Sequence, residues 1–281
     1  MKIKNLLVHL DPDPLCESRT RFAVQLARDL DAHLLGDAPT GLLKLPGALG
    51  MQEGTSLQDL GHSIRTAMER RAHDCAERFR DTCRMAGIPA FEALVDWADE
   101  SASLIHHAHC ADLVILSQAD PNGPDHHRKQ SLVEQVVLEC GRPTLILPYA
   151  GRHDSIGASV LVAWDDSREA TRAIDDALPL LRCAERVHVM RWRKASASAD
   201  VVPASLDALE RWLHSHGVAA TTHVEATDID VANALLSRAA DLGADLIVTG
   251  AYGHARWAER VMGGVTRTLL ASMTVPVLMS H

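Results

Sequence analysis

The segment Ala111-Asp-Leu-Val-Ile-Leu-Ser117 returns 133 residues later as Ala244-Asp-Leu-Ile-Val-Thr-Gly250. The prolines of Arg142-Pro-Thr-Leu-Ile-Leu and Val275-Pro-Val-Leu-Met are separated by the same 133 residues. At the front of each half, Leu6-Leu-Val-His-Leu-Asp11 matches Val160-Leu-Val-Ala-Trp-Asp165 with an offset of 154. A repeat that keeps one order over three segments predicts two copies of a single domain.

The two offsets differ by 21 residues, so the first copy carries about that much extra chain between its first and fourth apolar segments. Residues 36–56 are rich in glycine and proline, which predicts that the extra length lies in a loop there. The apolar pattern breaks again at residues 151–157. The sequence therefore predicts domains at residues 1–150 and 151–281.

Within each copy, short apolar runs alternate with longer segments of helical period, which is typical of β-α-β units and a parallel sheet. The predicted strands are 3–10, 32–38, 90–96, 112–117 and 144–148 in the first half, and 158–164, 186–192, 220–226, 245–250 and 275–280 in the second. Helices are predicted in the first half at 17–30, 58–86, 99–109 and 131–141. Each half thus reads as a doubly wound α/β layer with five parallel strands.

Composition narrows the class of protein. Hydrophobic residues make up 47% of the 281 residues but aromatic ones only 4%, which favours Ala/Val/Leu/Ile cores between helices and a parallel sheet. A net charge of -9 without a basic stripe argues against nucleic acid as a partner. The sequence contains no run of about 18 apolar residues of the kind that predicts a membrane span. The six cysteines form no C-x-x-C pair. We expect a cytoplasmic protein with reduced thiols.

Doubly wound sheets bind ligands beyond the carboxyl ends of their strands, where the strand order reverses. Gly250 ends the fourth predicted strand of the second half and Gly253 follows it. Nine residues then separate Gly253 from Gly263 and Gly264, which open the last helix. Glycines let the backbone approach an anion closely, and helix N-termini favour phosphate. The same glycines could equally serve only to turn the chain from strand to loop to helix.

This segment resembles the Gly-x2-Gly-x9-Gly-[Ser/Thr] nucleotide motif of the universal stress protein family, and the resemblance covers the chain as a tandem pair of domains. It implies two tandem flavodoxin-like (adenine nucleotide alpha hydrolase-like) doubly wound sheets that pair through their fifth strands. It also implies a role in stress survival, with ATP bound in some members.

The resemblance assigns the nucleotide site of the second half residue by residue. Gly250, Gly253 and Gly263 match the phosphate-loop glycines, whereas Gly264 stands at the Ser/Thr position, so that Thr266 is the nearest substitute hydroxyl. The remaining predicted contacts are Asp165, toward the ribose and base edge, and Val189, beside the adenine. For Asp165, capping of the following helix is an equally good interpretation. Trp164, where the family has a small residue, either packs outward or narrows the base pocket.

The first half lacks the glycines. Ser117, Asp120 and Gln130 occupy the positions that correspond to Gly250, Gly253 and Gly263. A carboxylate at the phosphate position repels phosphate, so we predict no ATP in this half. Its predicted role is that of a pseudo-partner, with strand 144–148 paired to strand 275–280 so that neither edge stays open.

No catalytic motif and no metal-ligand frame is present, although histidines cluster at 106–109 and 126–127. Any ATP hydrolysis is expected to be slow. Two hypotheses result: a stress-response regulatory protein that binds ATP or a related adenine nucleotide, with or without Mg²⁺, in its second half; or a nucleotide-free interaction scaffold. Further assembly into a homodimer is left open.

Overall fold

The computed structural model describes residues 2–41, 57–194, 204–253 and 264–281. Its strands are β1 (Asn5–His9), β2 (His33–Pro39), β3 (Phe91–Asp96), β4 (Leu113–Ser117), β5 (Thr144–Leu147), β6 (Ser159–Ala163), β7 (Arg186–Lys194), β8 (Ala220–Thr227), β9 (Leu246–Gly250) and β10 (Val277–Ser280). Its helices are α1 (Leu15–Leu30), α2 (Leu57–Met85), α3 (Glu100–Ala108), α4 (His126–Glu139), α5 (Arg168–Leu181), α6 (Ala204–Ser215), α7 (Val231–Asp241) and α8 (Gly264–Ser272).

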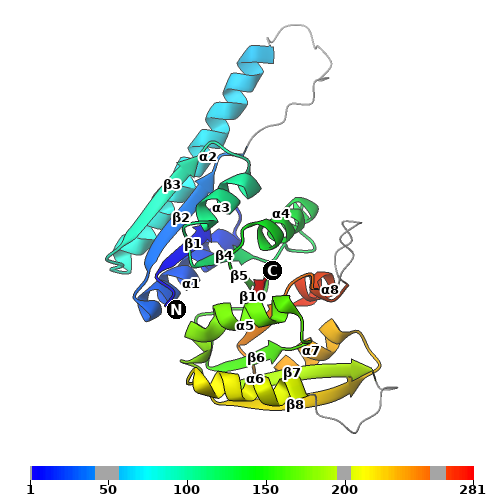
Figure 1. The fold of residues 1–281 in the computed structure, drawn as a ribbon. Coiled ribbons are helices and arrows are strands. Elements are labelled where there is room, and N and C mark those ends of the chain that lie inside the picture. The colour runs from blue at the N-terminus through cyan, green and yellow to red at the C-terminus, as the bar shows by residue number, and fades with distance from the viewer. Residues whose placement is uncertain (1, 42–56, 195–203, 254–263) are drawn as a thin grey trace.

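The strands of the described chain form one sheet in the order β3-β2-β1-β4-β5-β10-β9-β6-β7-β8 (Figure 1). Each half contributes five parallel strands with the doubly wound order that the sequence predicted. The order reverses between β1 and β4 in the first half and between β6 and β9 in the second. Those two reversals are where a doubly wound sheet opens its ligand crevice.

The two halves join through their fifth strands, as predicted. β5 and β10 pair antiparallel, with Ile146 opposite Val277 and Leu145 opposite Leu278. Both strands are buried along their whole length. The pairing converts two sheet edges into the centre of a ten-stranded sheet, which removes the unpaired N–H and C=O groups that an edge would expose.

Helices cover both faces of the sheet, and side chains alternate between two cores. Leu6 and Val8 of β1 join the core beneath α1, α2, α5 and α6, whereas Leu7 joins the core beneath α3, α4, α7 and α8. This alternation follows from the two-residue period of a strand. Burial on both faces also explains why the strands read as continuous apolar runs in the sequence.

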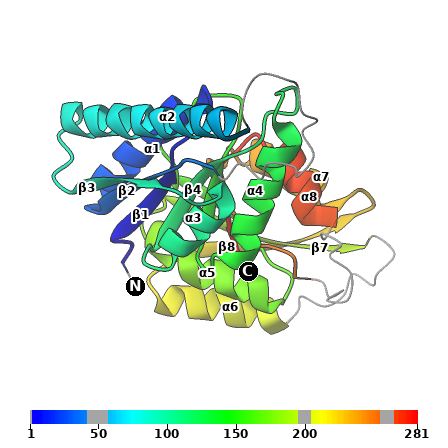
Figure 2. The same ribbon diagram turned by 90° about the horizontal axis from the view of Figure 1, so that it is seen from above.

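The extra length of the first half lies mainly in a helix. α2 has 29 residues, whereas its counterpart α6 has 12. Of the predicted loop 36–56, residues 36–39 belong to β2 and 42–56 lie outside the described residues. Figure 2 shows α2 as a single long helix across the first half. Much of the extra length therefore lies in α2, which confirms the helix predicted at 58–86, whereas the loop predicted at 42–56 is not tested.

Among the described residues, no helix combines the length and apolar character needed to cross a bilayer.

Candidate functional site

Asp165 lies directly beyond the carboxyl end of β6, exposed at the crevice of the second half. Its Oδ1 accepts hydrogen bonds from Ser167 N at 3.0 Å and Ser167 Oγ at 2.5 Å. Ser167 Oγ in turn accepts from Ala170 N at 3.1 Å and caps α5. The cap is thus Ser167 itself, and Asp165 fixes the hydroxyl that makes it.

Trp164 packs against the core, with its indole Nε1 donating to Asp166 Oδ1 at 2.9 Å. Asp166 has a φ of +64° and forms an ion pair with Arg191 on β7. The positive φ and the two side-chain bonds turn the chain sharply between β6 and α5. Trp164 therefore packs on the core and does not point away from the fold.

Gly250, the last residue of β9, and Gly253, which follows the strand, lie against the first turn of α5. A Cβ on Gly250 would be 2.5 Å from Ala170 N and 2.6 Å from the carbonyl carbon of Glu169. A Cβ on Gly253 would be 2.8 Å from Glu169 Oε2. The backbone contacts exclude a side chain at Gly250, whereas at Gly253 the end of the Glu169 side chain would have to move. The glycine requirement at Gly250 therefore has a packing cause that is independent of any ligand.

The carboxylate of Glu169 is the feature of this site that sequence reasoning missed. Glu169 is 5% exposed, and its Oε1 accepts from Arg168 Nε at 2.5 Å. The Arg168 side chain is itself 74% exposed, so it neutralises the buried charge weakly. A glutamate in helical register with the buried Ala173 and Ala177 is the signal that could have revealed it.

The remaining predicted contacts differ in their exposure. Thr266 is 6% exposed, and its Oγ1 accepts from Tyr252 N at 3.2 Å, so this hydroxyl holds the loop after β9 to α8. Gly264 is exposed at the start of α8, and a Cβ added to it would have no atom of the described residues within 4 Å. Val189 on β7 is fully buried in the core, so a base could touch it only if neighbouring side chains moved. Gly263 lies outside the described residues.

The corresponding crevice of the first half is closed by Arg19. Its guanidinium donates to Asp11 Oδ1 at 2.7 Å, to the His9 carbonyl at 2.8 Å and to Ser117 Oγ at 2.8 Å. Arg19 is 2% exposed and Asp11 9%. These bonds tie the ends of β1 and β4 together, and the cavity that remains there measures about 20 Å³. A nucleotide has no room at this position.

Two further ion pairs neutralise the cations near this crevice: Lys129 pairs with Asp13, and Arg128 pairs with Glu100. Burial lowers the pKa of His9 to about 4, partly offset by Asp11. Burial alone would raise the pKa of Asp11, yet the Arg19 guanidinium outweighs it and lowers that pKa to about 2. His9 is therefore neutral and Asp11 ionised at neutral pH.

The phosphate-loop region of the first half is a tight turn and a longer helix. Asp120 Oδ1 accepts from Asn122 N at 2.9 Å, and Gly123 N donates to Asp120 O at 3.0 Å. α4 then begins at His126, five residues before the predicted start at 131. Gln130 consequently lies within a helix, which agrees with the prediction that this half lacks the family's phosphate loop.

Histidines 106–107 and 126–127 form ring contacts in pairs. Within the described ranges, no group of three His, Cys, Asp or Glu side chains is arranged to hold a metal ion.

The fold and the two unequal crevices define a tandem doubly wound α/β protein whose halves share a strand order and differ in their ligand edges. The model of the Universal stress protein family matches residues 158–281. Residues 158–281 therefore belong to the universal stress protein family, and the first half repeats the strand order of that domain.

Solved structures resemble the whole chain. A universal stress protein from Archaeoglobus fulgidus superposes with a TM-score of 0.76 at 16% identity, covering 99% of this chain and 96% of that one. A functionally unknown protein from Pseudomonas aeruginosa gives 0.61 at 14% identity, with 99% and 92% covered. At these identities the likeness concerns the fold. No curated protein matches the sequence significantly.

Proposed function

We propose that the protein is a stress-response regulatory protein that binds ATP or a related adenine nucleotide in its second half. The observation that carries the proposal is the difference between the two crevices. At the β6–β9 reversal the chain presents Gly253 and, at the start of α8, the open position of Gly264. At the β1–β4 reversal the same edge is filled by Arg19.

The negative charge in the second-half crevice means that nucleotide binding there should require a cation. Glu169 places a carboxylate beside Gly253, at the proposed phosphate position, and its ion-pair partner is the exposed Arg168. Like charges at close range repel strongly where water is excluded. The proposed ligand is therefore the Mg²⁺ complex of the nucleotide, in which the metal offsets part of the phosphate charge.

Titration calorimetry of the purified chain with ATP, in Mg²⁺ and in excess chelator, tests the proposal. We expect one site per chain and binding at least about tenfold tighter with Mg²⁺, since tenfold corresponds to about 1.4 kcal/mol. Gly253→Val should abolish binding because its branched Cβ occupies the space in front of Glu169. Asn122→Val, in the equivalent turn of the first half, is the matched control and should leave binding intact. Absence of heat and of any thermal shift with ATP would refute the proposal.

The buried Glu169 and the missing hydroxyl at Gly264 favour a second candidate function, a nucleotide-free interaction scaffold. A negative titration together with no adenine nucleotide released from denatured protein would support that function. Under either function we propose at most slow ATP hydrolysis and a cytoplasmic location, which the six unbonded cysteines support.

A further inference from the structure

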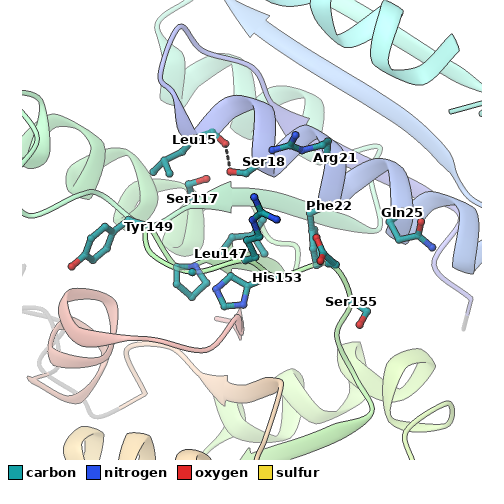
Figure 3. A pocket seen from close by; sticks show the side chains of 14 residues that line it. Leu15, Ser18, Arg21, Phe22, Gln25, Ser117, Leu147, Tyr149, His153 and Ser155 are labelled. Atoms are coloured by element: carbon teal, nitrogen blue, oxygen red, sulfur yellow. Dashed lines mark hydrogen bonds between the residues drawn. The ribbon is translucent and has the colours of Figure 1, made fainter. Parts of the chain in front are cut away.

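A second cavity lies where α1 faces the segment that joins the two halves. Its volume is about 560 Å³, within the range of small-molecule sites. Figure 3 shows Ser18, Arg21, Phe22 and Gln25 of α1 on one side and Leu147, His153 and Ser155 on the other. The cavity is separate from the proposed nucleotide site, since its lining comes from the first half and residues 148–155.

Basic side chains outnumber acidic ones along this cavity. Arg21, Arg152 and His153 line it, whereas its one acidic lining residue among those described is Asp154. Asp154 also lines an adjoining cavity of about 280 Å³, so this acid lies toward the boundary between the two. The charge along the wall is therefore suited to an anion.

The two arginines are available to a ligand. Arg21 pairs with Glu17 at 3.0 Å, but both side chains are largely exposed, so the pair is weak and easily exchanged. Arg152 is exposed and forms no ion pair with any described residue. An anion entering the cavity would gain charge-assisted hydrogen bonds without breaking a buried interaction.

Apolar side chains supply the rest of the lining. Phe22 and Leu147 are buried members of the core that reach the cavity, and Leu15 and Pro148 extend this surface. A ligand with an aromatic ring or short alkyl body would cover it. The Oγ of Ser18 already donates to Leu15 O at 2.9 Å, which leaves the serine oxygen as an acceptor.

The wall formed by the joining segment is a defined turn. Gly151 has a φ of +91°, and His153 Nε2 lies 3.2 Å from the Ala150 carbonyl oxygen. Tyr149 N donates to Gln118 Oε1 at 3.1 Å, and Gln118 Nε2 donates to the Leu270 carbonyl in the second half at 2.8 Å. The turn is thus positioned before any ligand binds, which lowers the entropic cost of binding.

We propose that this cavity binds a small organic anion that carries one acidic group beside an apolar ring or chain. The acidic group lies between Arg21 and Arg152, and the apolar body lies over Phe22 and Leu147.

The probe for the test is 8-anilinonaphthalene-1-sulfonate, followed by its fluorescence on the full chain. The neutral analogue N-phenyl-1-naphthylamine has the same aromatic body without the acid. We expect the sulfonate to bind at least about tenfold more tightly than the neutral probe, and Arg21→Ala with Arg152→Ala to remove that difference. Competition by benzoate and by phenyl phosphate then identifies which acidic group is preferred.

Ser18→Trp, which fills the cavity from an exposed helix position, should weaken both probes. Arg70→Ala removes an exposed arginine of α2 that lines none of the described cavities and is the matched control, with no expected effect. Sulfonate binding that is unchanged in both the double-arginine variant and Ser18→Trp overturns the proposal, as does equal binding of the two probes.

Discussion

Arg19 Nη2 donates to Asp11 Oδ1 at 2.7 Å in an ion pair whose side chains are 3% and 10% exposed. The pair lies at the strand reversal of the first half, between β1 and β4. At the corresponding reversal of the second half, between β6 and β9, the chain has Gly250 and Gly253. The buried guanidinium of Arg19 donates its hydrogen bonds to protein groups, so it occupies the space and satisfies the polar groups of this crevice. The first half therefore fills this crevice with a structural contact.

Replacing one partner of this pair should be costly. We expect Arg19→Leu to lower the free energy of unfolding by about 3–5 kcal/mol, because Asp11 and the His9 carbonyl lose their buried donor. Urea unfolding followed by circular dichroism measures the change. The double variant Asp11→Asn with Arg19→Met should recover part of the loss, since it leaves no unpaired buried charge.

The exposed pair Arg84–Asp81 on α2 is the control for that experiment. Arg84→Leu should change the free energy of unfolding by less than about 1 kcal/mol. Equal effects of Arg19→Leu and Arg84→Leu would show that burial of the first pair has no energetic consequence.

The strand order was predictable because repeated apolar runs and right-handed β-α-β connections leave few topologies. Val160 and Leu161 read as a continuous apolar run, and both are buried on opposite faces of the sheet. The long helix α2 was also predicted to within one residue at each end, because its helical period continues without a stop signal. The start of α4 was predicted less well, since the helix begins at His126, five residues before the predicted start at 131.

The candidate site was predictable only in part, since motif matching locates the backbone and overlooks charged side chains from neighbouring helices. Arg19 and Glu169 both enter their crevices from the helix after the first strand of each half. Arg19 shares a helical face with the buried Phe22 and Leu26, which was the signal available in the sequence. Arg19 contacts Ser117 and Glu169 lies against Gly253, and each of these neighbours is about 80 to 100 positions away in the sequence. No local pattern specifies such contacts.

Removing the charge of Glu169 should change how nucleotide binding depends on Mg²⁺. In chelator, Glu169→Gln should bind ATP about tenfold more tightly than the wild type, because the repulsion between carboxylate and phosphate is lost. With Mg²⁺ the two proteins should differ less. Calorimetry gives both affinities, and Glu185→Gln, an exposed glutamate of the second half, is the control. Identical Mg²⁺ dependence in wild type and Glu169→Gln would place the phosphates away from this carboxylate.

Substitution by alanine should change the free energy of unfolding differently at two glycines of this region. Gly250→Ala forces a Cβ to within 2.5 Å of Ala170 N, so the backbone of β9 or α5 must shift, and we expect a loss of about 1–3 kcal/mol in the free energy of unfolding. Gly264→Ala meets no atom within 4 Å and should leave stability unchanged or raise it by less than about 1 kcal/mol. Thermal and urea unfolding compare the pair. Equal destabilisation would contradict the packing explanation for Gly250.

Asp37, at the carboxyl end of β2, is a fully buried acid that no ligand site uses. Ser103 Oγ lies 2.9 Å from Asp37 Oδ1, 2.8 Å from Oδ2 and 3.0 Å from Asp96 Oδ2. Burial raises the pKa of Asp37 to about 7; the charge of Asp96 adds to this effect, while the bond from Ser103 opposes it. Folded protein therefore keeps a proton that the unfolded chain, with an ordinary pKa near 3.9, releases.

Stability from this group is fully present below about pH 4 and is lost as pH rises through about 7, because the unfolded state binds fewer protons over that interval. Asp37→Asn imitates the protonated acid, so we expect the variant to match the wild type near pH 4 and to exceed it by roughly 2–4 kcal/mol at pH 8. Buried His9 contributes a slope of opposite sign between about pH 4 and 6.5, and the difference between variant and wild type removes it. Urea midpoints from pH 4 to 8 measure that difference, with the exposed Asp74→Asn as control. A difference that stays constant with pH would show that Asp37 is ionised in the folded protein throughout this range.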